Sequence, residues 1–153
     1  MTLTKNAKLM SGITILIVPT IMYGGWTLLG VLMHGRVGGN AGALQLDATQ
    51  WALWRAGHAH AGVWTLLSLV LQILLDSARL SAALTWVARI SAPASAVALS
   101  AALFGLAFSV AFSPLLYLGI GLMLVTLLIT GIGLLRATRA GVSECRGGRS
   151  VPH

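Results

Sequence analysis

Four long apolar stretches constrain this chain more than any other feature of its sequence. They cover residues 9–33, 51–80, 82–112 and 114–136. Each is long enough for a helix that crosses a bilayer, which takes about 20 apolar residues. Charged residues make up 8% of the chain, too few to cover a soluble domain, for which about 25% is usual. The sequence therefore predicts an all-α integral membrane four-helix bundle in one domain, residues 1–138, followed by a polar tail over 139–153.

The basic residues indicate how these helices cross the bilayer. The formal net charge is +7, but Lys and Arg stand near the ends of the apolar stretches and form no patch interleaved with aromatic residues. This pattern is typical of topology signals and headgroup contacts, and it argues against nucleic-acid binding. Eight of the ten Lys and Arg residues lie in the N-terminus, the second loop and the tail, and the other two lie around the first loop. We therefore expect both termini in the cytoplasm and the start of the second helix near the outer face.

Small residues predict where helices pack closely. The third apolar stretch is mostly Ala, Ser, Val and Leu, and such side chains serve tight helix contacts better than a lipid-facing surface. We expect this helix at the centre, against other helices or other subunits. Glycines that predict close backbone approach on the first and fourth helices are Gly24, Gly25, Gly119, Gly121, Gly131 and Gly133.

The first loop, residues 34–50, is irregular and long for so compact a protein. Loops of this length are often functional or mobile. Two interpretations stay open: a lid over a site at the membrane face, or a plain solvated connector.

Two histidines stand near the start of the second helix. An ionisable side chain inside a membrane helix is costly and indicates function, although His58 and His60 also fit partly wet interfacial positions. Residues two apart point about 200° from each other around a helix, so one metal cannot easily take both. The face of His58 continues through small or polar residues, which suits the bundle interior: Gly62, Thr65, Leu69, Gln72 and Asp76. The face of His60 is bulky and suits lipid or a partner subunit: Trp64, Leu67, Leu71 and Leu74.

The apolar stretches contain few side chains that can bind a metal, and this limits which metal sites are possible. The spans offer two histidines, no cysteine and only Asp76 near one end, too few ligands for a zinc or di-iron site. Haem needs a single axial imidazole, and the small residues around the histidines leave room for a porphyrin or serve helix packing. Cys145 stands alone, which excludes covalent c-type attachment. No Ser-His-Asp set, carboxylate pair or phosphate loop is present.

Two segments resemble a known family. The first helix reads "MSGITILIV" and then "YGGWTLLG", a Gly-rich loop follows, and the second helix opens with "WRAGHAHAG". With four similarly spaced spans, the chain resembles the styrene oxide isomerases, small four-span bacterial membrane proteins. The resemblance implies a homotrimer in the bacterial inner (cytoplasmic) membrane that binds haem b through one histidine. Alignment on Trp54 places this ligand at His58, and alignment on the "AH-small-G" element places it at His60. The helical faces favour His58 as the axial ligand of the haem iron, with His60 as the alternative.

The resemblance also implies a reaction. Ferric iron accepts the oxygen of a small aryl epoxide as a Lewis acid, the benzylic C–O bond opens, and a 1,2-shift gives an aldehyde. Where the family has a pocket asparagine and a third-helix tyrosine, this chain has Trp64 and phenylalanines such as Phe104. Candidate pocket residues are therefore Tyr23, Trp64, Thr65, Phe104 and Tyr117. Two other functions stay open: a haem-binding sensor or electron carrier, and a non-catalytic membrane subunit.

Overall fold

The computed structural model describes residues 3–37 and 46–147. The helices are α1 (Lys5–Val37), α2 (Ala48–Leu75), α3 (Ala82–Leu106) and α4 (Ser113–Gly147), with a short 3-10 helix, η1 (Val110–Phe112), between the last two. All four α-helices are long and apolar enough to cross a membrane, and the described part of the chain contains no strand. The prediction of an all-helical chain with four helices able to cross a membrane is confirmed.

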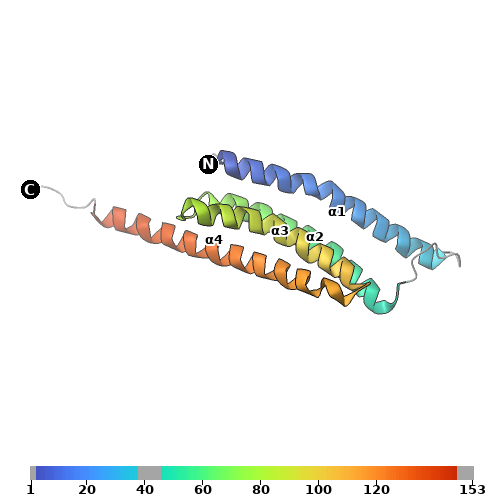
Figure 1. Ribbon diagram of the computed structural model, residues 1–153. Helices are drawn as coiled ribbons and strands as arrows, with labels where there is room; N and C mark the ends of the chain where they lie inside the picture. The colour runs from blue at the N-terminus through green and yellow to red at the C-terminus, as the bar shows by residue number, and fades with distance from the viewer. Residues whose placement is uncertain (1–2, 38–45, 148–153) are drawn as a thin grey trace, which may run out of the picture.

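The helices lie side by side in layers, with α1 on one side of the α2–α3 pair and α4 on the other (Figure 1). α4 packs mainly on α3, and no contact joins the described parts of α1 and α4. As its small side chains predict, α3 is the most buried helix: 56% of the residues in its apolar window are buried, against 6% for α1. The outermost helix, α1, is therefore the least tightly held.

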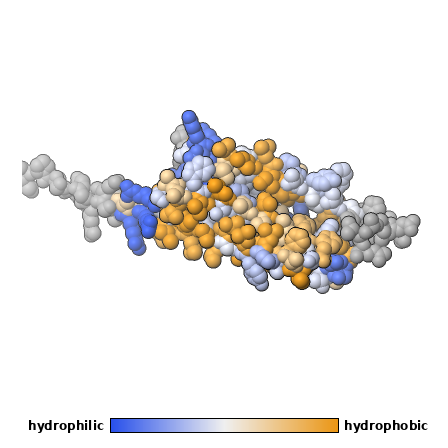
Figure 2. Space-filling model, viewed as in Figure 1, coloured by the Kyte–Doolittle hydropathy of each residue, from blue (hydrophilic) through white to orange (hydrophobic). Residues whose placement is uncertain are grey.

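The outer surface is apolar along most of its length. Figure 2 shows hydrophobic residues over the middle of one face and hydrophilic residues gathered toward its two ends. Large exposed apolar side chains occur on all four helices, for example Leu16 and Leu135. Such a surface suits a bilayer, because lipid hydrocarbon contacts the apolar side chains that no other part of the protein covers.

The start of α2 is set by a capping box that the apolar pattern did not reveal. The Asp47 carboxylate accepts a hydrogen bond from the Gln50 backbone N–H (2.8 Å), and the Gln50 side chain accepts one from the Asp47 N–H (2.9 Å). These bonds satisfy N–H groups that have no partner within the helix, so α2 begins before the expected Trp51. The Gln50 amide also donates to the Ala107 carbonyl (2.8 Å) at the end of α3. The first loop is thus shorter than predicted, and the lid hypothesis lies outside the described residues.

The connection between α3 and α4 also differs from the prediction. α3 ends at Leu106 rather than near residue 112, and the chain turns so that the Phe112 ring packs on Gly105. A Cβ added to Gly105 would lie 2.3 Å from that ring, so only glycine permits this turn. At its other end, α4 continues to Gly147, well into the segment expected as a tail.

A buried polar network joins the N-terminal segment to the ends of α2 and α3. The Arg89 guanidinium pairs with the Asp76 carboxylate and donates to the Gln72 side chain (3.0 Å). Gln72 in turn donates to the Arg89 carbonyl (2.8 Å). The backbone N–H and hydroxyl of Thr4 both donate to Asp76 (2.8 Å each). Arg89, expected at headgroup level, is instead 2% exposed, and Gln72 and Asp76 at the end of α2 supply its partners.

This network makes stability depend on pH. Burial alone raises the pKa of the Asp76 carboxyl, but hydrogen bonds from Thr4 and the Arg89 guanidinium outweigh it and hold the pKa below its ordinary value of 3.8. The unfolded chain therefore binds this proton first as the pH falls. The stabilisation is complete well above pH 3.8 and is lost as the pH falls through the folded pKa. Denaturant titrations in detergent between pH 6 and pH 2 should show a loss of stability at the acid end that Asp76→Asn reduces.

The glycines of α4 differ sharply in what surrounds them. A Cβ built on Gly119 would lie 2.7 Å from the Leu99 backbone nitrogen of α3, and one on Gly133 would lie 2.7 Å from the Leu80 side chain. Gly121 and Gly131 have no such neighbour within 4 Å. Within this chain the predicted close packing is therefore confirmed at Gly119 and Gly133 and is not found at Gly121 and Gly131.

Alanine at Gly119 should destabilise the protein by roughly 1–3 kcal/mol, because the obstructing atom belongs to the α3 backbone and cannot rotate away. Alanine at Gly121 should be neutral or stabilising by up to about 1 kcal/mol, because it raises helix propensity without a clash. Unfolding by SDS in mixed micelles measures both. Equal effects of the two variants would contradict the assigned α3–α4 contact.

Candidate functional site

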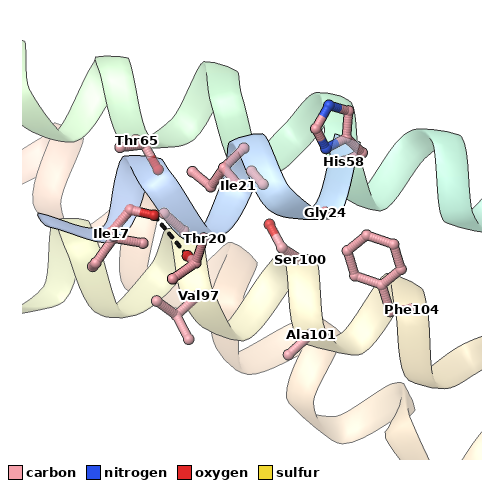
Figure 3. Close-up of a pocket in the computed structure, with 12 residues that line it drawn as sticks. Ile17, Thr20, Ile21, Gly24, His58, Thr65, Val97, Ser100, Ala101 and Phe104 are labelled. Carbon is pink, nitrogen blue, oxygen red and sulfur yellow. Dashed lines mark hydrogen bonds between the residues drawn. The ribbon is translucent and has the colours of Figure 1, made fainter. Parts of the chain in front are cut away.

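A cavity of about 260 Å³ lies between α1, α2 and α3 (Figure 3). The residues that line it are Ile17, Thr20, Ile21, Gly24, His58, Ala61, Thr65, Ala96, Val97, Ser100, Ala101 and Phe104. The lining is mostly apolar and carries no acidic or basic group except His58. Its volume falls just below the roughly 300–1,000 Å³ of pockets for drug-sized ligands. The cavity therefore suits a small, mostly apolar molecule.

His58 forms part of the cavity wall at the boundary between α2 and α1. The most buried stripe of α2 runs through Gly57, Ala61 and Thr65, so His58 lies at the edge of this stripe and is half-buried. Its ring packs against Gly25, where an added Cβ would lie 2.9 Å from both Cε1 and Nε2 of the imidazole. Among the described residues, neither ring nitrogen of His58 has a hydrogen-bond partner. The imidazole therefore has no polar partner here, although Gly25 of α1 packs against its Nε2 edge.

His60 lies outside the cavity, on the exposed side of α2. Its Nδ1 is 2.8 Å from the Ala56 carbonyl oxygen. Because a carbonyl can only accept, Nδ1 donates the hydrogen, and in the neutral ring Nε2 keeps its lone pair. The ring also lies near Trp64, with centroids 6.3 Å apart. His60 is thus oriented as metal-ligating histidines often are, but it faces lipid or another molecule.

The face of α2 that carries His58 points into the bundle, as predicted, whereas the face that carries His60 points outward only in part. Thr65 and Gln72, on the His58 face, are buried. On the other face, Leu71 is 3% exposed and belongs to the core, and Trp64 packs against that core. The prediction that this face meets lipid or a subunit is wrong for these two residues and for Leu67, which also packs against the core, because α2 is covered by α3 and also touches α4. His60 itself is exposed.

The structure brings together three of the predicted site residues and leaves others apart. His58, Thr65 and Phe104 share the cavity wall. Tyr23 and Tyr117 are 64% and 71% exposed and are not among the residues that line it. Of the small residues around the histidines, Ala61 lines the cavity and Gly57 instead packs on Phe104, with an added Cβ at 3.2 Å.

Sequence reasoning missed the contributions of α1 and of Ser100. The α1 lining residues follow the i, i+3, i+4, i+7 spacing of one helical face: Ile17, Thr20, Ile21 and Gly24. Ser100 stands one turn before Phe104 and one turn after Ala96, so the three share a face of α3. The signal was therefore present, but α3 offers several serines, and helical spacing alone does not show which faces a cavity.

Aromatic residues pack behind one end of the cavity. The Trp54 ring packs edge-on against Phe104 (centroids 5.8 Å apart) and against Phe108 (5.9 Å). Phe104 lines the cavity, so only the Phe104 ring separates the indole of Trp54 from a molecule bound there. Trp54 is therefore a natural fluorescent reporter of occupancy.

Within the described residues, no three His, Cys, Asp or Glu side chains come together to hold a metal ion. A haem iron would draw on one imidazole, so the histidines of α2 are the residues to test. Comparison with protein-family models, curated proteins and solved structures found no match for this chain.

Proposed function

We propose that the protein is a membrane isomerase that rearranges a small aryl epoxide, such as styrene oxide, to an aldehyde. The observation that supports this proposal best is the cavity between α1, α2 and α3, which is apolar, sized for such a molecule and has the His58 imidazole in its wall. The resemblance of "WRAGHAHAG" to the styrene oxide isomerases supplies the reaction type.

The cofactor of this proposal is haem b, with His58 as the axial ligand. The donor fits, because the imidazole has no hydrogen-bond partner among the described residues. The cavity as it stands is sized for the substrate and not for a macrocycle, and Gly25 of α1 packs against the His58 ring, so haem does not fit there with α1 in this position. When bound, ferric haem supplies a Lewis acid for the epoxide oxygen.

The chain's own residues would bind the substrate and keep water away. Phe104 offers a ring face or edge to the aryl group, a contact that favours offset or edge-on geometry. Ile17, Ile21 and Val97 complete an apolar wall. Such a wall excludes water, which would otherwise trap a carbocation-like species as a diol.

We propose further that both termini face the cytoplasm, that the membrane is the bacterial inner membrane, and that the protein is a homotrimer. The bias of Lys and Arg toward one side supports the topology. The exposed apolar surface of α1 and α4 leaves ample area for lipid or for neighbouring subunits.

Two measurements on detergent-purified protein test the function. An absorption spectrum should show a Soret band, and incubation with styrene oxide should yield phenylacetaldehyde. A colourless preparation that also leaves styrene oxide unchanged after haem reconstitution would rule the proposal out.

A second candidate is a haem protein without isomerase activity, such as a gas sensor. The orientation of His60 favours it, because the Ala56 carbonyl holds Nδ1 and leaves Nε2 on an exposed surface away from the cavity. Haem bound there would not meet a molecule in the cavity. Reduction followed by titration with carbon monoxide tests for an open coordination position, and inactivity toward styrene oxide separates this candidate from the first.

A further inference from the structure

Two hydroxyl groups face the cavity without a partner. Ser100 on α3 is 8% exposed and Thr65 on α2 is 4% exposed, and both line the cavity. The hydroxyl of Ser100 is buried and makes no hydrogen bond in the described structure, and Thr65 likewise has no partner there. In Figure 3 the two oxygens point from their helices toward the space between α1, α2 and α3.

Other buried hydroxyls in these helices, those of Ser68, Ser95 and Thr130, also lack a partner, but none of the three lines the cavity. A serine or threonine in a membrane helix ordinarily donates to a carbonyl one turn earlier. Thr14, Thr20 and Thr126 do so, with donor–acceptor distances of 2.8, 2.6 and 2.9 Å. Thr20 also lines the cavity, but its hydroxyl is already committed to the Ile17 carbonyl. Ser100 and Thr65 are therefore the cavity hydroxyls free to bind a ligand.

An unpaired buried hydroxyl is unfavourable, and a ligand oxygen would relieve it. We infer that Ser100 and Thr65 each offer a hydroxyl donor, at two separate points of the cavity wall, and that the ligand is a small aryl compound carrying one hydrogen-bond-accepting oxygen. The inference deepens the proposed function and rests on it for the aryl group. A hydroxyl donor recognises an ether, epoxide or carbonyl oxygen, whereas the apolar wall accepts the ring. Recognition of the oxygen thus comes from α2 and α3, and α1 contributes mainly apolar contact.

The test compares two unreactive probes of similar shape, acetophenone, which has an acceptor oxygen, and ethylbenzene, which has none. Affinities are measured by calorimetry or tryptophan emission for the full chain in detergent. Because each probe is compared across variants, its partition into micelles cancels. Ser100→Ala should weaken acetophenone binding about two- to tenfold and change ethylbenzene binding by less than about twofold. Thr65→Val, which keeps the side-chain volume, should act in the same direction.

Ser95 provides the matched control. It lies on the same helix, is 0% exposed and also carries an unpartnered hydroxyl, but it does not line the cavity. Ser95→Ala should therefore leave both affinities unchanged. The inference is overturned if Ser100→Ala leaves acetophenone binding intact, if it weakens both probes equally, if Ser95→Ala matches it, or if the wild type binds neither probe.

The result of this binding test does not depend on whether the protein is an isomerase. The probes do not react, so a protein without haem or isomerase activity can still show oxygen-selective binding. Conversely, an active isomerase whose Ser100→Ala and Thr65→Val variants bind acetophenone normally would refute this inference alone.

Discussion

His58→Ala should remove the Soret band and lower isomerase activity more than about 100-fold. Loss of a partner that only orients a metal ligand costs about 10–100-fold, and loss of the ligand itself should cost more. This effect is expected because His58 is the histidine that lines the cavity. Spectra and initial rates of phenylacetaldehyde formation, at equal protein concentration, measure it.

His60→Ala is the matched control, two residues away on the same helix. It should keep the Soret band and most of the activity, because His60 is exposed and lies outside the cavity. In His58→Gly, added imidazole should restore part of the Soret band, a rescue that a purely structural defect would not show. If His60→Ala loses haem and His58→Ala keeps it, the ligand assignment is wrong and the second candidate function gains support.

Arg89→Ala should cause the largest loss of stability in the protein. Removing one member of a buried ion pair typically costs about 3–5 kcal/mol, because the other charge is left without its partner. Asp76 lies at the end of α2, beside the membrane-spanning part, so the lower end of this range, near 3 kcal/mol, is expected. SDS unfolding in mixed micelles measures the loss.

Arg79→Ala removes the same charge from an exposed position in the connection between α2 and α3, and it should change stability by less than about 0.5 kcal/mol. The double variant Arg89→Leu with Asp76→Ala should lose less than the two single changes added together, because it leaves no uncompensated charge. Strict additivity would contradict a direct pairing. Since Asp76 also holds Thr4 at the start of α1, Arg89→Ala should in addition loosen the helix that closes the cavity.

Local chemistry explains why some boundaries differ from the apolar pattern. α2 starts at Ala48 because Asp47 and Gln50 form a capping box, a signal that the sequence contains in the spacing of those two residues. α3 ends early because the Phe112 ring occupies the space above Gly105. This second cause is a contact between residues on two sides of a turn, and hydropathy carries no information about it.

Site residues were predictable where helical spacing sufficed. His58 and Thr65 belong to one face of α2, and both line the cavity. Ser100 could not be separated from Ser91 and Ser95 on α3, because a small polar residue packs equally well against a helix or beside a void. Which serine faces the cavity depends on where α1 lies, and α1 is placed by long-range contacts such as those between Thr4 and Asp76.

The sequence by itself determined that the chain forms four membrane-length helices, that α3 is central and that the histidines of α2 point in different directions. These properties depend on hydropathy, residue size and helical geometry, which act within one segment. Only the tertiary structure decided that Arg89 is buried, that Gly119 rather than Gly121 meets the α3 backbone, and that His58 borders a cavity with Ser100. Each of these depends on the distance between helices, and that distance is set by the packing of all of them together.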